Sequence, residues 1–233
     1  MYLQKLNRFL SGQASESIAT GILLAMTGGF LETYSFISRE QVFANCQTGN
    51  LVLLATNAVQ GNLHKTIIYL TPVLTFMVGV FFTEYIKHRF REHPKIHWRQ
   101  ILVLVEVFLL LITGLIPSGP YNIVATTIIA LSCALQYDSF RKIRGYVCAT
   151  TMCTGNLRSL TENLFKCCIS SDSAARKKLI HYILIVGFFM VGAIGGSITT
   201  RIIGERAVWI CSFVLLVVFI MMFIRNEALD STQ

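Results

Sequence analysis

Charged residues are scarce in this chain, and that scarcity excludes whole classes of protein. Of 233 residues, 14% are charged and 54% are apolar, a balance too apolar for an ordinary soluble domain. The net charge of +8 does not indicate nucleic-acid binding, because the basic residues lie in short loops between apolar blocks, where they report orientation in a membrane. We therefore expect the lipid bilayer, and no nucleic acid, around this protein.

Signatures of common enzyme and metal chemistry are also missing. None of the seven cysteines stands at a metal-ligand spacing from a histidine, and the pair Cys167-Cys168 is too close for an ordinary disulfide. The sequence contains no nucleophile elbow and no phosphate loop. The first apolar run starts near Ser17 without a small-residue cleavage site, so we expect no cleaved signal peptide. We predict reduced thiols, no metal, no cofactor and no catalytic residue.

What the chain does have is a series of apolar blocks. Most are close to the ~20 residues that a helix needs to cross a bilayer. We predict spans over roughly 17–38, 66–86, 101–116, 121–140, 179–200 and 205–224. The block 101–116 is short for a span, and we expect Trp98 or Pro117 at its ends to lengthen it. Together the spans form a single membrane domain, 1–233.

An internal duplication is the strongest pattern in the sequence. The segment Phe43–Asn50 (FANCQTGN) returns as Val147–Asn156 (VCATTMCTGN), and a second tag, FMVG, occurs at Phe76–Gly79 and at Phe189–Gly192. Two halves with the same order of motifs indicate a repeat protein, with repeat one at about 17–116 and repeat two at about 121–225. Gly192 and Gly196 also have the small-xxx-small spacing of closely packed helices.

The loop charges favour one topology over another. If the segments 42–61 and 146–165 both cross the membrane, the basic residues divide almost evenly between its two sides. If both segments enter and leave on one side, six spans remain, and the outer side keeps only Arg39, Lys65, Arg201 and Arg206. The positive-inside rule favours the second arrangement, with both termini cytoplasmic.

Because each half has three crossings, an odd number, the second half has the opposite orientation in the membrane to the first. We therefore predict an all-α integral membrane protein with two inverted repeats. Each repeat has three spans plus one re-entrant or broken helix that carries Thr-Gly-Asn. Eight full spans stay open as the alternative.

The two Thr-Gly-Asn copies are the first candidate binding residues. Threonine is a good N-cap, glycine lets a ligand approach the backbone, and asparagine offers both a donor and an acceptor. Helices that begin at these copies would aim free N–H groups at a shared polar cavity. The alternative is that each copy only caps a kinked helix. The candidates are Thr48, Gly49, Asn50, Thr154, Gly155 and Asn156.

Polar residues inside the predicted spans are the second group. Glu32 precedes the first motif, and Gln136 and Asp138 precede the second, so we expect them to face a cavity or to lie at the interface. Glu106 is the deepest carboxyl. It is a candidate proton carrier, because burial favours the neutral form, or else a structural partner for Arg158 in the second motif.

The sequence resembles the YoaK-like bacterial membrane proteins of unknown function along nearly its whole length. Where this chain has Glu32, Tyr137 and Asn156, that family usually has Asp, Asn and Thr. The resemblance implies a bacterial inner-membrane location and supplies no substrate. It is carried by Gly29-Phe30-Leu31-Glu32, Val42-Phe43-Ala44-Asn45, Thr48-Gly49-Asn50, Leu135-Gln136-Tyr137, Thr150-Thr151 and Thr154-Gly155.

Inverted repeats, opposed helix starts and intramembrane carboxylates together favour a small secondary transporter or channel-like carrier for a small polar or anionic solute. A non-catalytic scaffold or assembly factor is the second hypothesis. A membrane-embedded enzyme that uses Glu32, Glu106 or a cysteine is the third. A homo-oligomer stays open under each of them.

Overall fold

Helices account for most of this protein, as its computed structural model shows for residues 16–90, 97–170 and 172–230. One antiparallel ribbon, β1 (Lys142–Ile143) with β2 (Tyr146–Val147), interrupts them. The predicted all-α class is confirmed apart from this ribbon. The helices are α2 (Ile18–Ser38), α3 (Gln47–Val59), α4 (Leu63–Phe90), α5 (Trp98–Thr113), α6 (Asn122–Ser139), α7 (Thr154–Ile169), α8 (Ser173–Ile203), the 3-10 helix η2 (Gly204–Ala207) and α9 (Val208–Asp230).

Each expected span falls on one of the long helices, and the segments 42–61 and 146–165 hold the short helices α3 and α7. As expected for the short block, α5 starts at Trp98. His97 is its N-cap and forms a capping box with Gln100. The chain breaks between α8 and α9 at Gly204, whose φ of 61° suits glycine.

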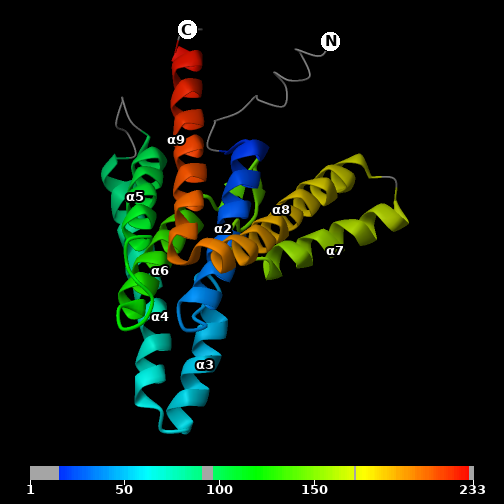
Figure 1. Cartoon of the computed structure of the whole chain (residues 1–233). Coiled ribbons are helices and arrows are strands. Elements are labelled where there is room, and N and C mark those ends of the chain that lie inside the picture. The colour runs from blue at the N-terminus through cyan, green and yellow to red at the C-terminus, as the bar shows by residue number, and fades with distance from the viewer. Residues whose placement is uncertain (1–15, 91–96, 171, 231–233) are drawn as a thin grey trace.

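The long helices of the two halves pack on each other. α2 lies against α8, α4 lies against α6, and α5 lies against α9. Within each half, the short helix packs on the long helix that follows it, α3 on α4 and α7 on α8. These two hairpins leave the body of the molecule in different directions (Figure 1).

The glycines of the repeated FMVG tag explain the cross-pairing. A Cβ on Gly192 of α8 would collide with the Met26 backbone of α2. A Cβ on Gly79 of α4 would lie 2.5 Å from the Ala134 Cβ of α6. The tag glycine of each half therefore packs on the first helix of the other half. The close packing predicted from Gly192 and Gly196 is confirmed.

The helix ends gather into two groups at opposite ends of the bundle. At one end, the Arg144 N–H donates to the Glu16 carbonyl (2.8 Å), and Arg99 pairs with the Glu16 carboxylate (3.4 Å). This end holds the starts of α2 and α5, the end of α6 and the ribbon. At the other end, the Ser118 N–H donates to Glu205 (3.0 Å), so the α5–α6 loop meets η2.

Arg39 belongs to the second end and is fully buried. Its Nη1 donates to Asn122 Oδ1 (3.1 Å), and its Nη2 donates to the Ile116 carbonyl (2.8 Å). The sequence predicts Arg39 only as one of the basic residues of the outer side, and its burial was not predicted. The guanidinium donates to the Ile116 carbonyl in the loop after α5, so this buried cation is held by hydrogen bonds.

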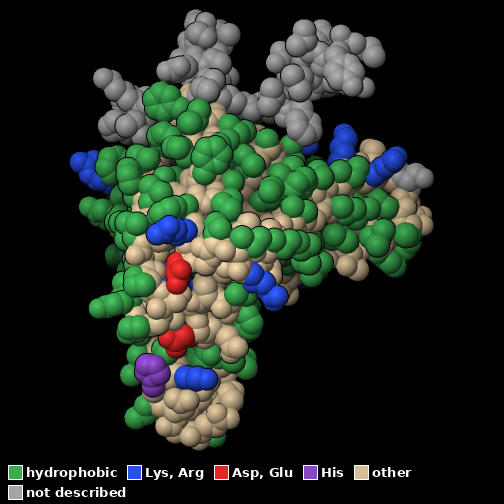
Figure 2. Space-filling model, in the orientation of Figure 1, with side chains coloured by type: hydrophobic (Ala, Val, Ile, Leu, Met, Phe, Trp, Pro, Cys, Tyr) green, Lys and Arg blue, Asp and Glu red, His purple; other side chains and the backbone are tan. Residues whose placement is uncertain are grey.

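Apolar side chains cover much of the face seen in Figure 2, and charged side chains lie at its upper edges and in a column along its lower part. Large exposed hydrophobic residues run along α4 and α8, among them Phe81 (77% exposed) and Ile202 (73%). Two helical stretches, Leu63–Phe90 and Ser173–Phe223, are long and apolar enough to cross a membrane by length and composition.

Candidate functional site

The two Thr-Gly-Asn copies have the same local structure, and a buried asparagine holds each of them. Asn50 Oδ1 accepts from the Phe43 N–H (3.0 Å), while its Nδ2 donates to the Phe43 carbonyl (2.8 Å). Asn156 forms the same pair with Ala149, at 3.2 and 2.6 Å. The amides that were expected to meet a ligand therefore bind the chain's own backbone and close a loop of equal length in each half.

The threonines of the motif are not N-caps, and the prediction that they cap the helices was wrong. α3 begins at Gln47 with Cys46 as its N-cap, which places Thr48 inside the first turn. α7 begins at Thr154, and its N-cap is Cys153. The asparagine clamp holds the loop before each helix, so the helical conformation starts before the threonine could act as a cap.

Glu32 supplies a negative charge at the start of α3. Its carboxylate accepts from the Asn45 N–H (2.7 Å) and the Cys46 N–H (3.3 Å). A carboxylate at this position stabilises the positive end of the helix dipole.

The loops that precede α3 and α7 meet on α2 at Gly28. Asn45 Nδ2 donates to the Gly28 carbonyl (3.1 Å). A Cβ on Gly28 would lie 2.5 Å from the Thr150 carbonyl oxygen, so only glycine allows the second loop to pass this close. Gln136 Nε2 fixes that loop from the other side by donating to Thr150 Oγ1 (3.0 Å) and to the Leu24 carbonyl (2.9 Å).

The remaining candidate residues lie apart from this junction. Glu106 is fully buried on α5, and neither of its carboxylate oxygens has a hydrogen-bond partner among the described residues. Arg158 is exposed on α7, so the structure does not form the Glu106–Arg158 pair. Asp138 is buried and lies 3.8 Å from Arg141, a weak ion pair at the end of α6.

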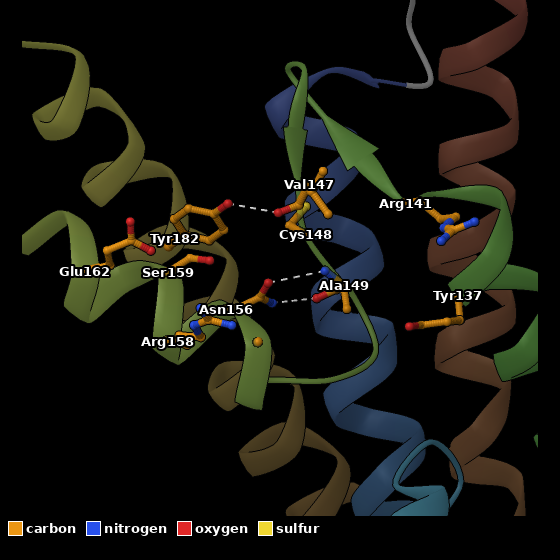
Figure 3. Close-up of a pocket in the computed structure, with 11 residues that line it drawn as sticks. Tyr137, Arg141, Val147, Cys148, Ala149, Asn156, Arg158, Ser159, Glu162 and Tyr182 are labelled. Carbon is orange, nitrogen blue, oxygen red and sulfur yellow. Dashed lines mark hydrogen bonds between the residues drawn. The ribbon is translucent and has the colours of Figure 1, made fainter.

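A cavity of about 420 Å³ adjoins the second motif (Figure 3). Gly155 and Asn156 line it, whereas the corresponding Gly49 and Asn50 of the first motif do not. Tyr182 closes one side by donating its hydroxyl to the Val147 carbonyl (2.8 Å). The lining residues are Tyr137, Arg141, Val147, Cys148, Ala149, Gly155, Asn156, Arg158, Ser159, Glu162 and Tyr182.

The chemistry of this cavity suits binding better than nucleophilic attack. Cys148 is buried, and a buried structural thiol is a poor nucleophile. Arg141 and Arg158 bring two permanent positive charges to the lining. Among the described residues, no group of three or more histidine, cysteine or acidic side chains is arranged to hold a metal ion.

Sequence reasoning identified Gly155, Asn156 and Arg158 but missed the rest of the lining. Tyr137 was noted only as a departure from a family pattern, and Arg141 was noted only as a loop charge. A position-by-position comparison of the two repeats would have pointed to Ala149, which stands where the first copy has Phe43.

Residues 20–221 match the model of a family described as "Protein of unknown function (DUF1275)". No curated protein and no solved structure shows significant similarity to the chain.

Proposed function

We propose that this chain, which belongs to the DUF1275 family of proteins of unknown function, is a multi-pass membrane carrier for a small polar or anionic solute. In this proposal it resides in the bacterial inner membrane with both termini in the cytoplasm. Its long helices cross the bilayer, and α3 and α7 are re-entrant. The apolar outer faces of α4 and α8 support contact with lipid.

The lengths of the short helices support re-entrance. α3 has 13 residues and α7 has 16, which correspond to about 20 and 24 Å at 1.5 Å per residue. Both are shorter than the ~30 Å hydrocarbon core of a bilayer. α5 also has 16 residues, so the hairpin that each short helix forms with the next helix carries the argument together with length. Each is followed within a few residues by the long helix on which it packs.

The grouping of helix ends supports an inverted repeat. α2 and α6 occupy corresponding positions in the two halves. The start of α2 and the end of α6 lie at the same end of the bundle, joined by the bond from Arg144 to Glu16. α2 and α6 therefore run in opposite directions, as two repeats of opposite orientation require.

The observation that carries the proposal is the meeting of the two interrupted segments at Gly28. Non-helical backbone at membrane depth needs polar partners, and Asn50, Asn156 and Glu32 provide them. Carriers built from inverted repeats bind their substrates where such discontinuous helices meet. A scaffold would have no need for two opposed helix interruptions at one point.

Reconstituted protein tests this function directly. The full chain in proteoliposomes is exposed to rapid jumps of acetate, succinate, citrate, glutamate and inorganic phosphate on a solid-supported membrane, and charge movement is recorded. We expect a transient current with at least one of these anions, and we expect Arg158→Gln to reduce it.

Arg201→Gln is the matched control, because Arg201 is an exposed arginine on α8 outside the cavity lining. Its currents should equal those of the wild type. If no anion of the panel produces a current and the protein binds a second protein tightly, the scaffold hypothesis is favoured over the carrier hypothesis.

A further inference from the structure

We infer that the cavity beside α7 binds a small dicarboxylate, and that the protein's own side chains close the corresponding position in the first half. This inference deepens the proposed carrier function and rests on it for its biological meaning. The binding site itself is argued from the geometry of the two repeats.

The first difference between the repeats is steric. An offset of 106 residues relates Asn50 to Asn156, Phe43 to Ala149 and Gly49 to Gly155. In the first copy, a Cβ on Gly49 would lie 2.8 Å from the Phe43 ring, which packs against Phe36 at a centroid distance of 5.1 Å. In the second copy, Gly155 faces open space, because Ala149 has no ring to fill it.

The second difference is electrostatic. In the first copy, the Glu32 carboxylate binds the backbone before α3. Its counterpart Asp138 instead lies beside Arg141, at 3.8 Å. The first half therefore has a carboxylate bound to the backbone before its short helix, whereas the corresponding carboxylate of the second half faces an arginine.

The third difference is the charge on the short helix. Arg158 stands where α3 has Val52, and Ser159 stands where α3 has Leu53. Arg158 and Ser159 both line the cavity. The repeat that has space for a ligand is therefore also the repeat that has a guanidinium and a hydroxyl beside that space.

The ligand class follows from the positions of the two arginines. Arg158 comes from α7, while Arg141 follows α6 and lies on the opposite side of the cavity (Figure 3). A guanidinium binds a carboxylate through two parallel hydrogen bonds. Two such groups on opposite sides fit an elongated ligand with a carboxylate at each end. The cavity's 420 Å³ lies within the ~300–1,000 Å³ typical of small-molecule sites.

The one carboxylate in the lining does not oppose this assignment. Glu162 pairs with Lys166 at 2.8 Å, so its charge is balanced. Asp138 is not part of the lining, and Arg141 is 68% exposed beside it. The 3.8 Å separation from Asp138 is too long for a hydrogen bond, so the exposed guanidinium of Arg141 can donate to a ligand while it stays beside that buried carboxylate.

The test measures binding to the purified full-length protein in detergent. Succinate and glutarate are compared with butyrate, which has the carbon count of succinate but one carboxylate. We expect the dicarboxylates to raise the melting temperature and to give a Kd by calorimetry, and butyrate to bind at least about tenfold more weakly, as expected for one lost charge-assisted pair.

Two variants and one control locate the site. Ala149→Phe reproduces the closed first copy and should abolish dicarboxylate binding. Arg158→Gln should weaken it at least about tenfold without the folding risk of an added ring. Arg201→Gln should leave it unchanged.

Absence of a shift with either dicarboxylate, equal shifts with butyrate, or undiminished binding by Arg158→Gln would overturn the assignment. Dicarboxylate binding without anion currents would support the proposed binding site and contradict the carrier function. Anion currents that neither Ala149→Phe nor Arg158→Gln reduces would support the carrier function and contradict this binding site.

Discussion

At the scale of single residues, the buried asparagines are the clearest case of side chains that replace missing secondary structure. Asn50 binds both polar groups of the Phe43 backbone, and Asn156 does the same for Ala149. The loop before each short helix has no strand or helix partner of its own. An amide, which is both donor and acceptor, is suited to fill that gap.

We predict that Asn50→Ala lowers the free energy of unfolding by on the order of 3 kcal/mol, because a buried donor and a buried acceptor each lose their partner. Asn156→Ala should have a similar effect. Thermal unfolding in detergent measures the change. Asn57→Ala is the control, since Asn57 bonds only to a carbonyl within its own helix. Equal stability of Asn50→Ala and Asn57→Ala would contradict the clamp.

Glu32 is a second residue whose role the contacts define. We predict that Glu32→Ala speeds amide exchange at Asn45 and Cys46, because the carboxylate that accepts from both N–H groups is removed. The loss at a helix start is about 1 kcal/mol. Hydrogen–deuterium exchange of the peptide covering 40–55 measures it.

Glu84→Ala serves as the comparison, since Glu84 interacts with Lys87 at the end of α4 and with Asp138 at the end of α6. Protection in the 40–55 peptide should not change in this variant. An equal loss of protection in both variants would indicate a global effect rather than the loss of a cap.

At the scale of helices, glycine decides which pairs form. Gly192 lets α8 reach the α2 backbone at Met26, and Gly79 lets α4 reach α6. Neither contact lies within its own repeat, so each half depends on the other for its packing. Because apolar side chains gain little from leaving lipid for a protein interface, such close backbone contact is a main source of helix association in a membrane.

We predict that Gly192→Ala destabilises the protein by about 1–3 kcal/mol, because the new methyl group meets α2 backbone that cannot move aside. Gly195→Ala, on the same helix, has open space around its Cβ and should be neutral or slightly stabilising. The gain in helix propensity is common to both variants, so the difference in melting temperature isolates the packing. Equal melting temperatures would refute the close contact.

At the scale of the whole molecule, the helix ends form two groups that fit six crossings. The ribbon at Lys142 lies with the starts of α2 and α5, whereas Lys65 lies at the start of α4, in the hairpin with α3. The sequence prediction assigns Lys142 to the cytoplasm and Lys65 to the outside. The loop 91–96 of the predicted cytoplasmic cluster lies outside the described residues.

We predict that, on a cysteine-free background, a single cysteine at position 65 reacts with a membrane-impermeant maleimide in intact cells, whereas one at position 142 reacts only after lysis. Both positions are exposed in the structure, so accessibility alone does not separate them. Labelling of both positions in intact cells would exclude the predicted arrangement.

Much of the fold could be read from local patterns. Apolar blocks of limited length correspond to α2, α4, α5, α6, α8 and α9, and the repeated Thr-Gly-Asn segments correspond to the starts of the two short helices. The N-caps were misplaced at Thr48 and Thr154 instead of Cys46 and Cys153, because the clamps formed by Asn50 and Asn156 depend on contacts that helix-capping rules do not include. The burial of Arg39 was not predicted for a similar reason, since its partners come from segments far along the chain.

The sequence by itself determined the helical class, the repeated motifs and the positions of the polar groups along the chain, because these depend on composition and spacing. Only the tertiary structure decided how the polar groups are used. It directed Asn50 and Asn156 to the backbone, Glu32 to the start of α3, and Glu106 to an apolar core without a partner. It also opened a cavity at Ala149 where Phe43 closes the equivalent position. The physical reason is that a cavity is the space left by the packing of several helices, and no segment contains that information alone.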